Sequence, residues 1–170
     1  MEGLNMKEEL TGSAKRVQDF LRDNGFACRV KELPDSTRTA IEAAKAIGCD
    51  VAQIAKSLIF VDKESGSPIL IIASGINQVD IGKVERFTGL YLAKADGDFV
   101  KERVGFAIGG VPPVGHKEKI RTFLDPSLKD YEWIWAAAGT PFAVFQLNAS
   151  ELQKMTAGTF IDLKLASVKN

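Results

Sequence analysis

The chain has 170 residues, which is long enough for one domain with a substantial buried core. Hydrophobic residues make up 45% of the chain and charged residues 26%, proportions that are typical of a globular protein in water. The 22 lysines and arginines balance the 22 aspartates and glutamates, so no overall field attracts the chain to nucleic acid. We therefore expect no DNA partner, and any RNA contact requires a local basic patch.

Helices and strands alternate in the first half of the chain. Thr39 and Glu42 form a capping box at the start of an alanine-rich helix, which Gly48 ends. Two apolar runs separated by a turn that contains Gly66 indicate a hairpin. The predicted elements are a helix over 13–24, a strand over 26–33, a helix over 39–47, a helical turn over 50–55, and strands over 56–61 and 68–73.

The second half continues this mixture and adds a second hairpin. Asp80 and Asn148 are predicted N-caps, and Gly158 ends the helix that Asn148 begins. About seven strands and about five helices in mixed order favour an α+β domain with a mixed sheet over a doubly wound parallel sheet. The predicted elements are a helix over 80–88, a strand over 91–94, a helix from 96 or 98 to 103, strands over 119–124, 132–138 and 142–147, a helix over 148–157 and a strand over 160–165.

Residues 105–116, GFAIGGVPPVGH, have neither helical nor strand periodicity, and we call them the glycine-proline loop. Gly109 and Gly110 allow another molecule to approach the main chain closely. Pro112 and Pro113 restrict the backbone and make the loop stiff. The N–H groups of Gly109, Gly110 and Val111 are predicted to be available to a carbonyl or phosphate oxygen. These features indicate a binding site, and a tight turn between two strands is the alternative.

The glycine-proline loop also has a spacing that superficially matches a nucleoside-triphosphate loop, with Gly110 and Gly115 separated by four residues. Lysine and then serine or threonine follow in such loops, whereas His116 and Lys117 follow here. Prolines, moreover, cannot donate the amides that cradle phosphates. We therefore expect no nucleoside triphosphate and no other cofactor.

Three side chains are candidates for chemistry. Lys56 lies between a capped helical turn and an apolar strand, where its charge either points to solvent or lines a cavity. In a cavity, a lysine can polarise an ester carbonyl, bind a phosphate, or lose its proton and act as a base. His116 is either a general base or hydrogen-bond donor at the loop exit, or a solvent-facing residue. Cys28 is predicted to be a buried structural thiol rather than a nucleophile.

The cysteine and histidine content and the hydropathy exclude several classes of protein. Only Cys28, Cys49 and one histidine are present, so we expect neither a disulfide framework nor a protein-only zinc site. The N-terminal residues lack an apolar run after their charges, and no window approaches the roughly 20 apolar residues of a membrane span. The sequence therefore predicts a cytoplasmic protein without a metal and without membrane contact.

Four segments together carry a resemblance to a known family: AKSLIF, ASGINQVD, GFAIGGVPPVGH and AAAGTPFAVFQL. In this combination and order the chain resembles the YbaK/ProX family of aminoacyl-tRNA deacylases, which includes the editing insertion domain of bacterial prolyl-tRNA synthetases. The likeness extends over about residues 26–166. It implies one editing domain over residues 1–170, with residues 1–25 as a lead-in and helix, and a compact, barrel-like mixed sheet flanked by helices.

The resemblance also implies the activity and the site. The functional lysine of the family falls on Lys56, and its glycine-x-x-x-proline loop falls on residues 109–113. A water molecule or the substrate itself would attack the ester of a mischarged tRNA, with the amides of Gly109, Gly110 and Val111 at the ester carbonyl and Lys56 at a phosphate or the developing oxyanion. The expected substrate contacts are Pro112, Pro113, His116, Thr39 and Gly139.

The expected substrate is alanine or another small residue on proline tRNA, bound by its acceptor end, and prolyl-tRNA synthetase is a candidate partner. Within the resemblance, the loop is closer to free-standing members that remove small aliphatic residues than to cysteine-specific members. The alternative is a non-catalytic module that uses the same pocket to bind a nucleotide, an RNA or a synthetase. The neutral net charge is compatible with that alternative.

Overall fold

The computed structural model describes Leu10 and residues 12–166. The predicted lead-in, residues 1–10, lies outside the described residues except for Leu10. No helix in the described part of the chain is long and apolar enough to cross a membrane. The helices are α2 (Gly12–Asp23), α3 (Ala40–Ile47), α4 (Ile81–Thr88), α5 (Gly97–Arg103) and α6 (Ala149–Thr156), with the short 3-10 turns η1 (Val51–Gln53) and η2 (Pro126–Asp130).

The strands form one sheet of mixed direction, so the predicted mixed α/β class is confirmed. The order across the sheet is β1-β7-β6-β2-β3-β5-β8, and β4 pairs with β2 outside this path. β2 runs parallel to β6, and β5 runs parallel to both β3 and β8, whereas the hairpins β2–β3 and β6–β7 are antiparallel. The strands are β1 (Val30–Glu32), β2 (Ile54–Asp62), β3 (Pro68–Ser74), β4 (Leu92–Lys94), β5 (Arg121–Leu124), β6 (Ile134–Ala137), β7 (Ala143–Leu147) and β8 (Thr159–Phe160).

The local signals at the helix ends agree with the structure. The side chain of Thr39 accepts a hydrogen bond from the N–H of Glu42, whose carboxylate accepts one from the N–H of Thr39, so the predicted capping box is confirmed. Asn148 and Glu151 form the same arrangement at the start of α6. The end of α6 differs, because Ala157 rather than Gly158 takes the left-handed backbone, with φ of 54°.

Two predicted strands are much shorter in the structure than the sequence indicates. The strand predicted over 26–33 is limited to Val30–Glu32, because only these residues pair with β7. The strand predicted over 160–165 is reduced to Thr159–Phe160, followed by a single bridge between Val79 and Lys164. These differences arise because ladder partners, which a single strand's own pattern does not contain, decide where a strand ends.

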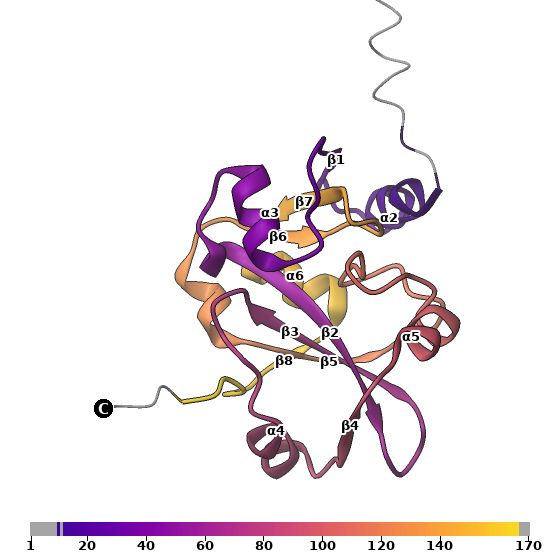
Figure 1. Ribbon diagram of the computed structural model, residues 1–170, viewed down its shortest axis with the longest axis vertical. Coiled ribbons are helices and arrows are strands. Elements are labelled where there is room, and N and C mark those ends of the chain that lie inside the picture. The colour runs from indigo at the N-terminus through magenta and orange to yellow at the C-terminus, as the bar shows by residue number, and fades with distance from the viewer. Residues whose placement is uncertain (1–9, 11, 167–170) are drawn as a thin grey trace, which may run out of the picture.

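β3 is the centre of the fold. All of its residues are buried, as is typical of a strand that is covered on both faces. Leu70 and Ile72 face the large cluster that includes residues of α2, α5 and α6, whereas Ile69 and Ile71 face a second cluster with Val84 of α4. Figure 1 shows α3 and α6 on opposite sides of β2. The sheet is therefore the middle layer between helices.

The edge of β2 that faces away from β3 is interrupted. On the edge away from β3, β6 pairs only with Ile54 and Ala55, and β4 pairs only with residues 60–62. Residues 56–59 therefore have a strand neighbour on the β3 side alone. An unpaired stretch inside a sheet exposes main-chain donors and acceptors. This gap over residues 56–59 adjoins the candidate site.

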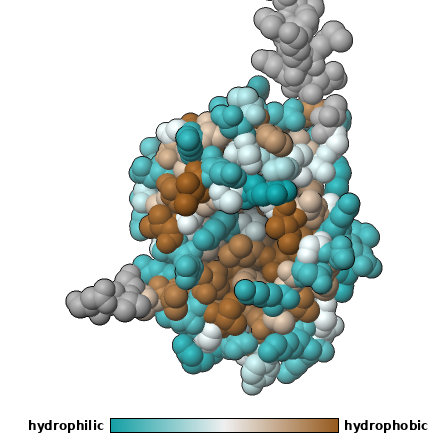
Figure 2. Space-filling model, in the orientation of Figure 1, coloured by the Kyte–Doolittle hydropathy of each residue, from teal (hydrophilic) through white to brown (hydrophobic). Residues whose placement is uncertain are grey.

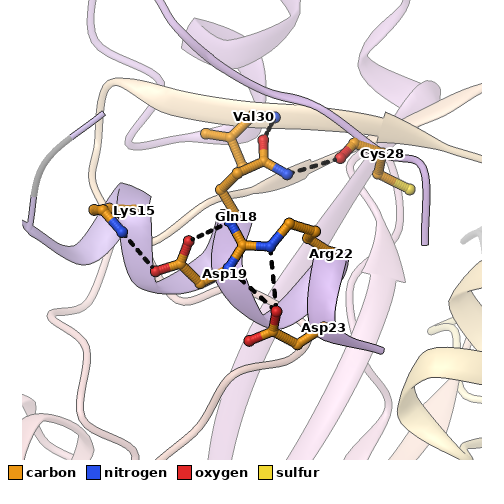
Figure 3. Close-up of polar contacts among 7 residues, drawn as sticks. All are labelled: Lys15, Gln18, Asp19, Arg22, Asp23, Cys28 and Val30. Carbon is orange, nitrogen blue, oxygen red and sulfur yellow. Dashed lines mark hydrogen bonds and ion pairs between the residues drawn. The ribbon is translucent and has the colours of Figure 1, made fainter. Parts of the chain in front are cut away.

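α2 is tied to the segment before β1 by a glutamine. The side-chain amide of Gln18 donates to the carbonyl of Cys28 at 3.1 Å, and its oxygen accepts from the N–H of Val30 at 2.8 Å (Figure 3). The ion pairs on the outer face of the helix, such as Lys15 with Asp19 at 2.8 Å, are exposed to solvent and therefore contribute little to stability. Packing of Val17 and Leu21 and the Gln18 bridge therefore hold α2 in place.

Candidate functional site

A cavity of about 380 Å³ lies between α3, β2, β6 and the glycine-proline loop. Figure 2 shows an apolar hollow on this face of the molecule, edged by hydrophilic residues. Among the described residues, no aspartate or glutamate lines the cavity, whereas Arg38 and Lys56 do. The remaining lining residues are Thr37, Thr39, Ala40, Ala43, Ile54, Ala55, Ser57, Leu58, Ile108, Gly109, Val111, Trp135, Ala136, Ala137 and Val144.

Lys56 is one of the residues that line this cavity. It lies within β2, which begins at Ile54, and it pairs with Ala73 of β3. Its Nζ lies 3.5 Å from the carbonyl oxygen of Gly75. Burial of the ammonium group lowers the pKa of Lys56, and the negative charge of Asp125 opposes this shift. The side chain thus brings a partly desolvated cation into a cavity without acidic residues.

Asp125 is almost fully buried behind this lysine, with 1% of its surface exposed. Its carboxylate accepts hydrogen bonds from the N–H of Ser74 at 3.0 Å and from the side-chain amide of Asn77 at 2.8 Å. These neutral donors satisfy much of the carboxylate's bonding capacity. Asp125 therefore contributes a fixed negative charge near Lys56 without an ion pair between them.

The glycine-proline loop contributes Gly109 and Val111 to the cavity. Gly109 has φ of 95°, and a β-carbon on it would lie 2.9 Å from Cγ of Arg38, so glycine lets the arginine side chain lie against the loop. The Gly109 N–H has no hydrogen-bond acceptor among the described residues. It is therefore available to an oxygen atom of a ligand, and the binding role expected from the sequence stays a prediction.

Gly110 differs from that prediction. Its N–H donates to the carbonyl of Ala107 at 3.1 Å, so this amide is already used within the loop. Its carbonyl accepts from the N–H of Gly139 at 2.9 Å, and a β-carbon on Gly110 would lie 2.8 Å from Cα of Thr140. Gly110 and Gly139 therefore clamp the loop to the β6–β7 turn and do not line the cavity.

Two further predicted residues, Pro113 and His116, line a different cavity of about 330 Å³ together with Phe20 and Met155. Nε2 of His116 lies 2.6 Å from the carbonyl oxygen of Pro112, a distance at which the ring N–H donates to that carbonyl. The ring also meets Phe106 edge to face. The structure thus places His116 under the loop, away from Lys56.

We expect His116 to make stability depend on pH. Burial lowers the pKa of His116 from its ordinary value of 6.5, so the unfolded chain binds a proton more readily than the folded one. The free energy of unfolding should therefore be highest above pH 6.5 and should fall as the pH drops below that value. Chemical denaturation at a series of pH values measures this slope. The His116→Gln variant keeps a side-chain hydrogen-bond donor but has no titratable group at this position. Its free energy of unfolding should therefore change less with pH than that of wild type, and an equal pH dependence would contradict the prediction.

The structure adds two hydroxyl-bearing cavity residues that were not among the candidates from the sequence, Thr37 and Ser57. Their hydroxyl oxygens are buried and have no hydrogen-bond partner among the described residues. Thr39 also lines the cavity. Cys28 does not, and burial together with the charge of Glu151 raises the pKa of its thiol to about 11, so it remains protonated. The described residues contain no group of three or more His, Cys, Asp or Glu arranged for a metal ion.

Comparison with known proteins identifies the family of this fold. Residues 34–155 match the family model of the aminoacyl-tRNA editing domain. The Bacillus subtilis protein YwhH is 33% identical over 127 residues, which cover 75% of this chain and 80% of that protein. The Enterococcus faecalis protein named “Putative Cys-tRNA(Pro)/Cys-tRNA(Cys) deacylase EbsC” is 25% identical over 134 residues, 74% of this chain and 76% of that protein.

A solved structure agrees with the family model. The crystal structure described as “a putative trans-editing enzyme for prolyl tRNA synthetase” superimposes with a TM-score of 0.87 and 48% sequence identity. The match covers 93% of this chain and all of the other. Both the sequence segment that contains Lys56 and the glycine-proline loop lie inside the matched region of the family model. The chain therefore belongs to the aminoacyl-tRNA editing domain family.

Proposed function

We propose that this protein is a trans-acting deacylase that hydrolyses the ester bond of mischarged tRNA. The observation that carries the proposal is that Lys56 and Gly109 line one cavity, although they come from distant parts of the chain. The names of the deacylase relative and of the trans-editing structure support the same class of reaction. An aminoacyl ester is already activated, so orientation and charge stabilisation are sufficient for catalysis without a protein nucleophile.

In the proposed mechanism, a water molecule, or a reactive group of the substrate, attacks the ester carbonyl. The N–H groups of Gly109 and Val111 orient the ester, and the ammonium group of Lys56 stabilises a phosphate of the terminal nucleotide or the developing oxyanion. Gly110 acts differently from the sequence expectation, by holding the loop in place through its contact with Gly139.

The proposed substrate is alanine, or another small residue, on proline tRNA. Ala43, Ile54 and Ala136 supply an apolar wall with few polar groups, which suits a small aliphatic side chain. One methylene more or less in such a pocket changes binding by only about 1–3 kcal/mol. We therefore expect modest selectivity among small residues rather than absolute specificity.

The proposed partner is the acceptor end of tRNA. Arg38 and Lys56 line the main cavity, and Lys94 lines an adjoining one. These three cations would lie near the phosphates of a terminal nucleotide bound in the two cavities. Because the net charge is zero, the chain has no overall attraction to RNA. We therefore propose that prolyl-tRNA synthetase presents the tRNA to it. Charging of tRNA in the cytoplasm makes that compartment the proposed place of action.

The test is deacylation of alanine on proline tRNA beside correctly charged prolyl-tRNA. We expect fast loss of alanine and little loss of proline, measured as release of the labelled amino acid over time. If alanine is retained, the same assay with serine, threonine, cysteine and 2-aminobutyrate extends the search to other small residues. Absence of hydrolysis across this panel would contradict the proposal and favour a binding module.

A further inference from the structure

We propose that Ser57 is a further catalytic residue, whose hydroxyl group binds the carbonyl oxygen of the aminoacyl ester. The inference rests on the proposed function and adds a residue to it. In the hydrolysis, the water oxygen bonds to the ester carbon while one of its protons passes to solvent water. The bond to the ribose oxygen then breaks, and that oxygen takes up a proton from solvent water. The carbonyl oxygen carries the negative charge in between, and donors placed around it accelerate the step.

The first support is the unsatisfied hydroxyl itself. Buried polar side chains almost always have a hydrogen-bond partner, so an exception calls for an explanation. Among the described residues the two exceptions are Thr37 Oγ1 and Ser57 Oγ, and both residues line the cavity that contains Lys56. Because no partner holds the Ser57 hydroxyl, rotation about χ1 toward the cavity breaks no hydrogen bond. An oxygen atom of a ligand in the cavity would accept the hydrogen bond for which the Ser57 hydroxyl has no partner in the protein.

The second support is the interrupted edge of β2. The N–H of Asp62 donates to Ser67 on the β3 side, and the N–H of Lys63 donates to Tyr91 on the β4 side. Since main-chain groups alternate between the two sides of a strand, the N–H of Ser57 faces away from β3, as that of Lys63 does. β6 stops pairing at Ala55 and β4 starts at Phe60, so no strand covers Ser57 on that side. The main chain of Ser57 therefore faces the gap.

The third support is the position of Ser57 relative to the glycine-proline loop. Ser57, Gly109 and Val111 line both the main cavity and an adjoining cavity of about 260 Å³ that contains Lys94. These residues therefore mark the place where the two cavities meet, and an acceptor end that occupies both would carry its ester there. The Gly110 amide is used by Ala107, which leaves the loop one donor short of the sequence expectation. The hydroxyl of Ser57 supplies that donor from β2.

The experiment compares Ser57→Ala with Ser57→Thr, which retains a hydroxyl, and with Ser65→Ala in the exposed hairpin turn as a matched control. The esters of alanine, serine and 2-aminobutyrate on proline tRNA are the substrates. We expect Ser57→Ala to lower kcat by about 10²-fold. It should also raise KM by about fivefold, because the hydroxyl already holds the carbonyl oxygen in the bound substrate. Both factors should be similar for all three esters, because the carbonyl is common to them. Ser57→Thr should recover much of the rate, and Ser65→Ala should equal wild type.

Thermal unfolding separates catalysis from folding. Removing an unpartnered hydroxyl should leave Tm unchanged or higher, whereas a structural role would lower it. A kcat for Ser57→Ala within about threefold of wild type would overturn the inference. A loss confined to one amino acid would also overturn it, because it would indicate recognition of the side chain rather than of the ester.

Binding of a non-hydrolysable adenosine analogue, with an alanyl amide in place of the ester, separates this inference from the proposed function. We expect Ser57→Ala to weaken binding about fivefold or more, the usual effect of losing one hydrogen bond. If wild type hydrolyses no ester but shows this difference in binding, the deacylase proposal fails and the carbonyl contact of Ser57 stands. If wild type neither hydrolyses the esters nor binds the analogue, both are wrong.

Discussion

Replacing Lys56 with alanine should reduce deacylation of mischarged tRNA by about 10²–10³-fold, the usual effect of losing a group that stabilises charge in the transition state. The reason is that Lys56 brings a partly buried cation into a cavity that has no acidic lining residue. Electrostatic interactions are stronger in such surroundings than in bulk water. Single-turnover deacylation of alanine from proline tRNA measures the effect directly.

The control for this variant is Lys63→Ala, which removes an exposed lysine just beyond the far end of β2 and should leave the rate unchanged. The pH dependence adds a second check. Because burial lowers the pKa of Lys56, a mechanism that uses its cation should lose rate as the pH rises through that lowered value, earlier than for an ordinary lysine. Wild-type rates in Lys56→Ala would refute the role given to this residue.

Substituting Gly110 with alanine should both destabilise the protein by about 1–3 kcal/mol and slow deacylation by about 10²-fold. Gly110 does not have a left-handed φ, so the effect comes from contact alone. The added methyl group would lie 2.8–2.9 Å from main-chain atoms of Thr140, which cannot move as a flexible side chain can. The loop would shift, and Gly109 and Val111 would shift with it.

The matched control is Gly97→Ala at the start of α5. A β-carbon there would meet only Cδ1 of Ile108 at 3.9 Å, an ordinary van der Waals distance, so stability and rate should stay near wild type. Chemical denaturation gives the free energy of unfolding, and the deacylation assay gives the rate. Equal stability of the two variants would show that the loop accommodates the methyl group, contrary to our expectation.

The site is thus an arrangement of segments around an interruption in the sheet. β2 carries Lys56 and Ser57 at its unpaired stretch, the segment before α3 carries Arg38, and the loop carries Gly109. The His116–Pro112 hydrogen bond closes the loop internally, and the N–H of Gly139 holds the loop to the β6–β7 turn. Each catalytic role proposed above therefore depends on contacts between residues that are far apart in the chain.

The sequence by itself determined the features that depend on neighbouring residues. The capping box of Thr39 and Glu42 lies within one helical turn, so its geometry follows from local chemistry. The apolar run of β3 likewise predicted a strand, and its burial on both faces follows from its composition. The combination and order of the four motifs were sufficient for the resemblance to the family, which the family model confirms.

Only the tertiary structure decided how the site is assembled. The stretch of β2 without a second neighbour depends on where β6 and β4 stop pairing, and nothing in the pattern of β2 itself contains that information. The use of the Gly110 amide, the separate cavity of His116 and the unpartnered hydroxyl of Ser57 are likewise contacts across the fold. Local sequence determines which groups a segment carries, but long-range packing determines which of those groups remain free to bind a substrate.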